Sequence, residues 1–239
     1  MRSDGRLADE LRPLQIERDY TRYAQGSVMV QAGYTRIICT AMAEDRVPPH
    51  CLDHRTGWVT AEYYMLPGAN PNRKSLWQGP DGRTREIERM IGRSLRMAVD
   101  LAQIGPRTIW IDCVVIQADG GTRTASISGG FIALVDALWR LRQEGKIPAL
   151  PVKSGISAIS VGVVEGLPML DLTSAEDQAA SVDMNVVMTH SGQFIELQGT
   201  AELEPFDEGC LHQLLDLAAK GAAQVRDAQL QVLQGRLPV

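Results

Sequence analysis

The chain has 239 residues, of which 44% are hydrophobic and 22% charged, and its formal net charge is −5. This composition excludes a disordered or fibrous protein, and the length favours one or two domains of about 150 residues each. The longest uncharged runs, Thr124–Val135 and Ser154–Val164, are shorter than the ~18 apolar residues of a membrane span, and we expect no secretory signal at the N-terminus. The cysteines form no CxxC motif, so we expect reduced thiols in a cytoplasmic protein: Cys39, Cys51, Cys113 and Cys210.

The charges are unevenly distributed along the chain. Residues 1–123 contain 17 Lys and Arg residues and 15 Asp and Glu residues. Residues 124–239 contain 7 Lys and Arg residues and 14 Asp and Glu residues, so the negative charge is concentrated there. Only four of the basic residues are lysine, and arginine is the side chain that binds phosphate through two parallel donors. A GC-rich genome is the simpler explanation of the arginine bias, and a phosphate-rich partner for the first half is the alternative.

The first half begins with apolar runs that are typical of β-strands, at Gly26–Val30, Tyr34–Ala43 and Trp58–Met65. The segment Leu66–Gly82 is rich in proline and glycine, which predicts a long exposed loop, and loops of this kind are often functional. Apolar residues at helical spacing then predict a helix over Thr84–Leu101. A row of arginines at helical spacing lies on another face of this helix. This face is either solvated or a surface for an anionic partner, and its residues are Arg85, Arg89, Arg93 and Arg96.

The remaining pattern predicts a strand over Arg107–Asp119 and a helix over Ala125–Gln143, after which strands precede a helix once more. The later elements are strands at Ile156–Val164, Pro168–Leu172, Met184–Thr189 and Gln193–Gly199, and an amphipathic helix over Asp207–Leu233. We therefore predict an α+β layered fold that forms a single compact domain with internal pseudo-symmetry. Its first lobe is expected to span about residues 1–145 and its second lobe about 146–239.

The segment from Gly120 to Thr124 joins a predicted strand to a predicted helix. The first turn of a helix carries unpaired N–H groups and a partial positive charge, and two glycines let a ligand approach the backbone. Arg123 adds a forked donor, and Thr124 is predicted to cap the helix. These features indicate a phosphate site, with an ordinary Gly-Gly turn as the alternative. Arg83, at the start of the arginine-rich helix, favours the phosphate site.

Asp171, Asp177 and Asp183 lie six residues apart around a loop between two strands. Carboxylates at strand ends are typical ligands of a divalent cation, although aspartates that form turns are an equally good explanation. Together with the arginines, they favour metal-assisted phosphoryl or nucleotidyl transfer. His50, Cys51 and His54 have the right residue types for a metal, but no fourth ligand lies at a usual spacing, and we predict no site there.

Two longer motifs are highly specific: residues 117–126 read QADGGTRTAS and residues 183–189 read DMNVVMT. Further matches are RSDGR at residues 2–6, GWVTAEY at 57–63, GRT at 82–84 and QGTAE at 198–202. Over nearly its whole length the chain resembles the ribonuclease PH family, phosphate-dependent 3′-exoribonucleases that trim tRNA precursors.

The resemblance implies a two-lobed ribonuclease PH-type fold, related to the second domain of ribosomal protein S5, and a homohexameric ring built as a trimer of dimers. It implies that inorganic phosphate, as co-substrate, binds at Arg83 and at the Gly121-Thr122-Arg123 segment. Asp177 and Asp183 match the acidic pair that holds Mg²⁺ (or Mn²⁺) and assists the leaving group. The implied reaction is the reversible phosphorolysis of single-stranded RNA 3′ ends, above all on tRNA precursors, which releases nucleoside 5′-diphosphates.

The chain departs from the family in the loop before the arginine-rich helix. Gly68 stands where the family usually has an arginine, and the loop is shorter. Arg73 and Lys74 are kept, and Trp77 is gained; we expect all three to contact RNA, with packing of Trp77 against a neighbouring subunit as the alternative. Two other functions stay open: a catalytically weak or inactive RNA-binding ring subunit of an exosome-like assembly, and a hydrolytic nuclease.

Overall fold

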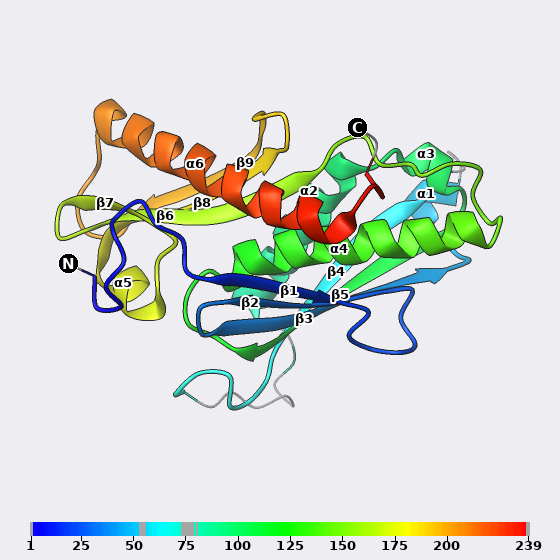
Figure 1. Ribbon diagram of the computed structural model, residues 1–239, viewed down its shortest axis with the longest axis horizontal. Helices are drawn as coiled ribbons and strands as arrows, with labels where there is room; N and C mark the ends of the chain where they lie inside the picture. Colours follow the sequence, from blue (N-terminus) through cyan, green and yellow to red (C-terminus); the bar gives the residue numbers. More distant parts are fainter. Residues whose placement is uncertain (1, 53–55, 73–78, 80, 238–239) are drawn as a thin grey trace.

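A computed structural model describes residues 2–52, 56–72, 79 and 81–237. The described chain forms two β-sheets, and a long helix, α4 (Thr122–Gln143), lies between them (Figure 1). The strand order of the first sheet is β1-β2-β3-β5-β4, and only the β4–β5 pair is parallel. Its strands are β1 (Leu14–Arg18), β2 (Gly26–Ala32), β3 (Thr35–Glu44), β4 (Trp58–Met65) and β5 (Thr108–Gln117).

The second sheet is antiparallel throughout, with the strand order β7-β6-β8-β9. Its strands are β6 (Ile156–Val164), β7 (Leu167–Leu170), β8 (Ala180–Thr189) and β9 (Phe194–Ala201). The remaining helices are α1 (Pro49–Leu52), α2 (Gly82–Ala98), α3 (Leu101–Ile104), α5 (Ser174–Ala179) and α6 (Glu208–Leu233). The prediction of an α+β fold with sheets and helices in layers is confirmed.

Helix α4 is the centre of the molecule because it packs on β2 and β3 on one side and on β6 on the other. Ile127, Phe131 and Leu134 are fully buried in the main core. Gly129 brings the helix close to the first sheet: a Cβ atom there would lie 2.6 Å from Cγ2 of Val30 and 2.9 Å from Sγ of Cys39. Every residue of α4 from Thr124 to Leu138 is buried, which agrees with a helix covered on both sides.

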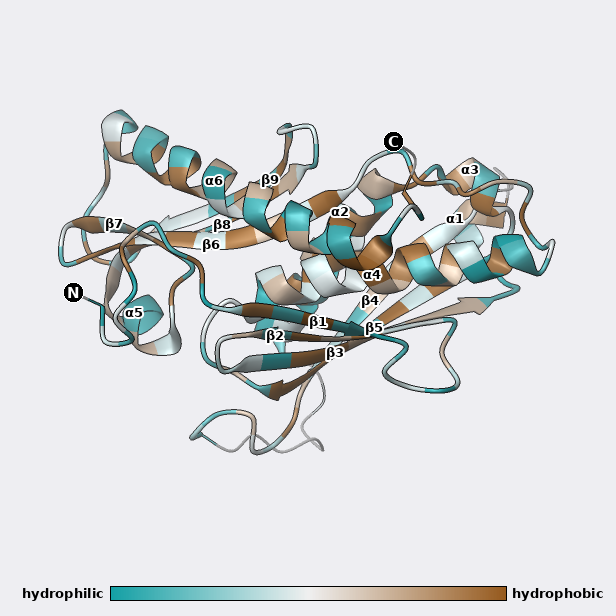
Figure 2. Ribbon diagram, viewed as in Figure 1, coloured by the Kyte–Doolittle hydropathy of each residue, from teal (hydrophilic) through white to brown (hydrophobic). Residues whose placement is uncertain are grey.

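Helix α6 covers the opposite face of the second sheet. Its buried residues, which include Leu214, Ala218 and Ala222, pack against Val161 and Met184 of that sheet in a second hydrophobic cluster. The alternation of hydrophilic and hydrophobic bands along α6 in Figure 2 is the pattern of a helix with one covered face. Within the part of the chain that the structure describes, no helix combines the length and apolarity that a membrane crossing requires.

The predicted elements differ from the observed ones mainly at their ends. Helix α4 begins at Thr122, and its N-cap is Gly121 in the left-handed conformation, with φ 65° and no side-chain capping bond. The prediction that Thr124 caps this helix is therefore wrong; its hydroxyl donates to the carbonyl of Gly121 at 3.0 Å. Strand β8 starts at Ala180, so it includes Asp183. The short elements β1, α1, α3 and α5 were not predicted.

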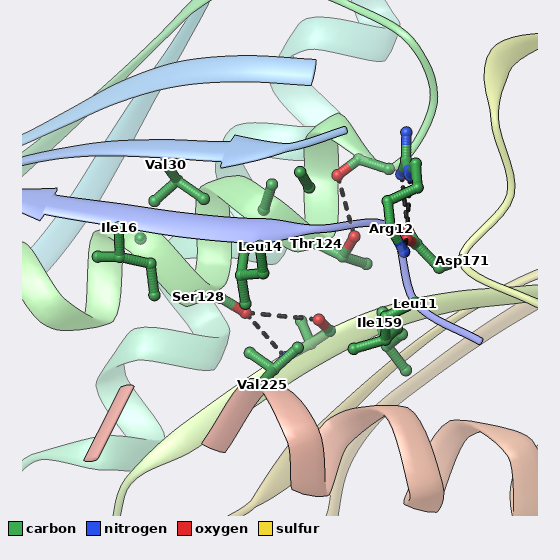
Figure 3. Close-up of a pocket in the computed structure, with 15 residues that line it drawn as sticks. Leu11, Arg12, Leu14, Ile16, Val30, Thr124, Ser128, Ile159, Asp171 and Val225 are labelled. Atoms are coloured by element: carbon green, nitrogen blue, oxygen red, sulfur yellow. Dashed lines mark hydrogen bonds and ion pairs between the residues drawn. The ribbon is translucent and has the colours of Figure 1, made fainter. Parts of the chain in front are cut away.

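A buried ion pair joins the N-terminal segment to the turn after β7. Nε of Arg12 donates to Oδ2 of Asp171 at 2.9 Å, and its Nη2 donates to Oδ1 at 2.6 Å (Figure 3). Arg12 also donates to the carbonyl of Asp119, at the start of the turn that leads into α4. Beside this pair lies a small cavity of about 30 Å³ that is lined mostly by apolar side chains, Leu14 and Val30 among them.

Candidate active site

A cleft of about 750 Å³ opens between the N-terminus of α4, α5 and β8. It brings together the sequence-predicted phosphate-binding and acidic residues, although they come from segments far apart in the chain. Its lining includes Arg83, Gly121, Thr122, Arg123, Asp177 and Asp183. The cleft therefore combines positively and negatively charged side chains on one surface.

The turn before α4 presents backbone donors to the cleft. Gly120 and Gly121 both adopt positive φ, at 76° and 65°. A Cβ atom at Gly120 would lie 2.2 Å from the carbonyl oxygen of Leu172, so only glycine fits this position. With no side chain capping the helix, its first-turn N–H groups remain available to an anion at the positive end of the helix dipole.

Thr122 is oriented from behind by a buried tyrosine on β4. The hydroxyl of Tyr63 donates to Oγ1 of Thr122 at 2.9 Å, and Tyr63 is only 3% exposed. Burial raises the pKa of Tyr63, which keeps the phenol protonated as a donor. Because Oγ1 of Thr122 accepts this bond, the threonine can direct its own proton into the cleft.

The two arginines of the cleft come from the first turns of two helices. Helix α2 starts at Gly82, where the N-cap Asp81 accepts a hydrogen bond from the backbone N–H of Thr84 at 2.8 Å, and Arg83 is exposed beside this cap. Arg123 belongs to the first turn of α4, and its Nη1 donates to Oε1 of Gln198 at 3.3 Å. Two forked donors thus face one cleft from different elements.

The acidic pair lies on α5 and β8, across the cleft from the glycine turn. Helix α5 is held by a capping box between Thr173 and Glu176, which fixes Asp177 on the next position. Partial desolvation raises the pKa of Asp177, against the opposing charges of Arg83 and Arg123. The pKa of Asp183 is raised to about 6, first by desolvation and then by the charge of Asp177. Two carboxylates that repel each other and open onto a cleft fit a cation.

Asp171 does not join this pair. Its carboxylate is paired with Arg12, and it is 5% exposed in the turn after β7. It supports the cleft through Arg12, which donates to the carbonyl of Asp119 one residue before the glycine turn. The six-residue spacing of the three aspartates therefore groups two residues of the cleft with one that supports it.

Several cleft residues escaped the sequence analysis. Asn185 follows Asp183 by two positions on β8, so both side chains project from the same face of the sheet. Opposite Asn185 lies Ser160, which is 5% exposed and whose hydroxyl has no hydrogen-bond partner within the described chain. Strand alternation would have identified Asn185 had the predicted strand begun before Met184. Ser160 lies in a continuous apolar run and gave no signal.

The remaining candidates are divided between described and undescribed parts of the chain. Arg73, Lys74 and Trp77 fall outside the described residues, as does His54. His50 packs edge-on against Trp58 with 4.7 Å between the ring centroids, and Cys51 is buried. Among the described residues, no cluster of three or more His, Cys, Asp or Glu side chains has the geometry of a metal site.

The arginine row of α2 is partly engaged within the chain. The guanidinium of Arg96 lies over the ring of Trp58, with 4.3 Å from its carbon to the ring centroid. Arg93 pairs with Glu196 of β9, its Nε donating to Oε2 at 3.1 Å. Arg85 and Arg89 are exposed.

Solved structures with the same fold include the crystal structure of rice (Oryza sativa) Rrp46, with a TM-score of 0.80 and 20% identity over 98% of this chain and 100% of that chain. An exosome from Archaeoglobus fulgidus with RNA bound to the active site has a TM-score of 0.82 and 22% identity, over 95% of this chain and 91% of that chain. An archaeal exosome core has a TM-score of 0.76 and 20% identity, over 95% of this chain and 90% of that chain.

The sequence itself matches both domains of one family. Domain 1 of the 3′ exoribonuclease family matches residues 10–139, and domain 2 matches residues 156–221. The first match contains the glycine turn and both cleft arginines, and the second contains the acidic pair. With matches over most of its length, this chain belongs to the 3′ exoribonuclease family of the RNase PH type.

Proposed function

We propose that this protein is a phosphate-dependent 3′-to-5′ exoribonuclease that trims tRNA precursors. The observation that carries the proposal is the meeting of Arg83, Arg123, Asp177 and Asp183 in one cleft of about 750 Å³. A subunit without activity would be free to lose any of these four side chains. Membership in the 3′ exoribonuclease family supports the exonuclease part of the proposal.

In the proposed reaction, an oxygen of inorganic phosphate attacks the phosphorus of the last 3′–5′ phosphodiester. A new P–O bond forms to the phosphate, the bond to the 3′ oxygen breaks, and that oxygen takes up a proton. The products are a nucleoside 5′-diphosphate and an RNA shorter by one nucleotide. Phosphate is already anionic at pH 7, so positioning of the two reactants matters more than a general base.

The chain's own residues would do this positioning. Arg83, Arg123 and the N–H groups at the start of α4 bring the phosphate next to a second anion, the scissile phosphodiester. The hydroxyl of Thr122, oriented by Tyr63, adds a neutral donor at the same end of the cleft.

We propose that Asp177 and Asp183 hold Mg²⁺ (or Mn²⁺). The donor set fits, because Mg²⁺ usually takes one or two carboxylates and completes its shell with water and substrate phosphates. Desolvation and then the charge of Asp177 raise the pKa of Asp183, and a bound cation would offset this repulsion. When bound, the ion would neutralise negative charge on the transferred phosphoryl group and on the 3′ oxygen.

A second candidate has support from the solved structures. Rrp46 and the archaeal exosome core share this fold, which favours a ring-forming RNA-binding subunit of an exosome-like assembly with weak or no activity. We further propose a homohexameric ring, a trimer of dimers, for the active form. The two candidates share an RNA-binding ring and differ in turnover, so an activity measurement separates them.

The test is a degradation assay with a 5′-labelled single-stranded RNA and Mg²⁺, with and without inorganic phosphate. We expect shortening of the RNA only with phosphate, and nucleoside diphosphates as the released products. Release of monophosphates without phosphate would indicate a hydrolytic nuclease. RNA binding without any release of nucleotides would favour the ring subunit.

A further inference from the structure

Gln198 on β9 lies between two charged side chains of opposite sign. Nη1 of Arg123 donates to Oε1 of Gln198 at 3.3 Å, and Nε2 of Gln198 donates to Oε1 of Glu86. Arg123 belongs to the start of α4 and Glu86 to α2, three residues after Arg83. One side chain of the second sheet therefore contacts both helices that carry the cleft arginines.

The orientation of the Gln198 amide follows from the chemistry of its neighbours. A guanidinium only donates hydrogen bonds, and an ionised carboxylate only accepts them. The amide oxygen must therefore face Arg123, and the amide nitrogen must face Glu86. Gln198 is a neutral spacer between a cation and an anion that attract each other.

A direct contact between Arg123 and Glu86 would have a chemical cost for the cleft. Arginine and carboxylate groups form strong, often two-pronged pairs, and such a pair would turn the guanidinium toward Glu86 and cancel much of its charge. With the amide in between, the positive charge of Arg123 stays directed into the cleft that Asp177 and Asp183 also line.

We propose that Gln198 is a positioning residue for phosphate binding. It orients the guanidinium of Arg123 toward the cleft and prevents Arg123 from forming a direct ion pair with Glu86. The inference rests on the proposed function, in which Arg123 binds the attacking phosphate. It assigns to the second lobe a role in phosphate affinity that is separate from the acidic pair.

Strand β9 offers a matched control two residues away. The side chain of Glu196 lies on the same face of β9 as Gln198 and also contacts α2, through its ion pair with Arg93. This contact helps to dock β9 on α2, but neither residue lines the cleft. Glu196→Gln therefore loosens the same interface without touching the spacer.

The experiment compares Gln198→Met with wild type and Glu196→Gln in the full-length protein. Methionine has a similar length but no hydrogen-bond donor and only a weak sulfur acceptor. Inorganic phosphate binding is measured directly by titration calorimetry, and the phosphate KM and kcat by RNA degradation. We expect Gln198→Met to weaken phosphate binding and raise the phosphate KM by about tenfold, with kcat at saturating phosphate within about threefold of wild type. Glu196→Gln should leave phosphate affinity unchanged.

The double variant Gln198→Met with Glu86→Gln tests whether a direct ion pair between Arg123 and Glu86 causes the loss of phosphate affinity. Removal of the Glu86 carboxylate should return phosphate affinity to within about threefold of wild type, a coupling that a merely structural role of Gln198 does not produce. If Gln198→Met does not fold, Gln198→Glu replaces it: a carboxylate beside Arg123 should weaken phosphate binding by more than about tenfold.

Each result decides a different question. Unchanged phosphate affinity in a folded Gln198 variant, or no recovery in the double variant, overturns the role of Gln198 and leaves the proposed function standing. Absence of both phosphate binding and phosphorolysis in the wild-type protein overturns the proposed function instead.

Discussion

Arg12 and Asp171, 159 residues apart in the chain, form a two-pronged ion pair in which both side chains are almost completely buried. Asp171 adopts a left-handed conformation with φ 54°, and its carboxylate also accepts from the backbone N–H of Arg12 at 2.9 Å. The pair thus fixes the N-terminal segment against the turn after β7. Through the bond from Arg12 to the carbonyl of Asp119, it also supports the turn that leads into the proposed phosphate site.

Asp171→Asn should destabilise the protein by about 3 kcal/mol, because loss of one partner leaves a buried charge unpaired. Asparagine tolerates the left-handed conformation, so the change isolates the effect of charge. Urea unfolding measures the difference. Asp45→Asn, which breaks the exposed pair between Asp45 and Arg107, is the control and should cost less than about 1 kcal/mol. Equal effects of the two changes would contradict the structural role of Asp171.

Arg123→Ala should leave the fold intact and lower kcat/KM for phosphate by about a hundredfold or more, a loss of about 3 kcal/mol in transition-state binding. Arg83→Lys should also bind phosphate poorly, since a point charge does not replace a forked donor. The exposed Arg89 on α2 provides the control, and Arg89→Ala should not alter the phosphate dependence. An Arg123→Ala protein that is folded and has an unchanged phosphate KM would exclude this residue from the site.

Asp183→Asn should abolish turnover and leave RNA binding nearly unchanged, because the acidic pair is assigned to the chemical step and not to the grip on RNA. Fluorescence anisotropy with labelled RNA measures binding, and release of nucleoside diphosphates measures turnover. Loss of RNA binding with normal turnover of the RNA that still binds would show that the assignment is wrong.

The stability of the folded protein should also depend on Asp183 in a pH-dependent way. Its pKa rises from the ordinary value of 3.8 to about 6 on folding, so ionisation of Asp183 destabilises the native state progressively as the pH increases from about 4 to 6. In the absence of divalent cations, Asp183→Asn should therefore raise the stability at pH 8 by about 1–2 kcal/mol, allowing for solvent screening of this partly exposed side chain. Below pH 4 the two proteins should melt alike. Asp216→Asn, at an exposed position on α6, controls for the change in net charge.

Gly68→Arg should strengthen tRNA binding and steepen its salt dependence, by a slope of roughly 0.7 if the new side chain contacts one phosphate of a single strand. Gly68 has room for a side chain, because a Cβ atom there meets nothing within 4 Å among the described residues. Turnover of short single-stranded oligonucleotides should stay the same. Binding isotherms at several salt concentrations test this, and an unaltered slope would remove the loop from the RNA interface.

Local signals in the sequence identified residues that meet in the cleft, at the end that we propose binds phosphate, and failed at the contacts that support them. Gly121 and Arg123 stand in one short segment between a strand and a helix, so the pattern itself predicts their role. The start of α4 was misplaced, because the pattern favours a threonine cap where a left-handed glycine ends the turn. Tyr63 and Gln198 were missed for another reason: their importance depends on bonds to Thr122 and Arg123 that only the packing of distant strands creates.

The burial of α4 between the two sheets has a consequence for synthesis of the chain. Ser128 bonds to the backbone of β6 at Ala158, and Gln229 of α6 donates to the carbonyls of Ser128 and Ile156 at 3.0 Å each. These contacts need residues that leave the ribosome long after α4 itself. Until β6 and the segments that follow it have emerged, one side of the central helix stays uncovered, so we expect the nascent chain to expose apolar surface that the second sheet and α6 later cover.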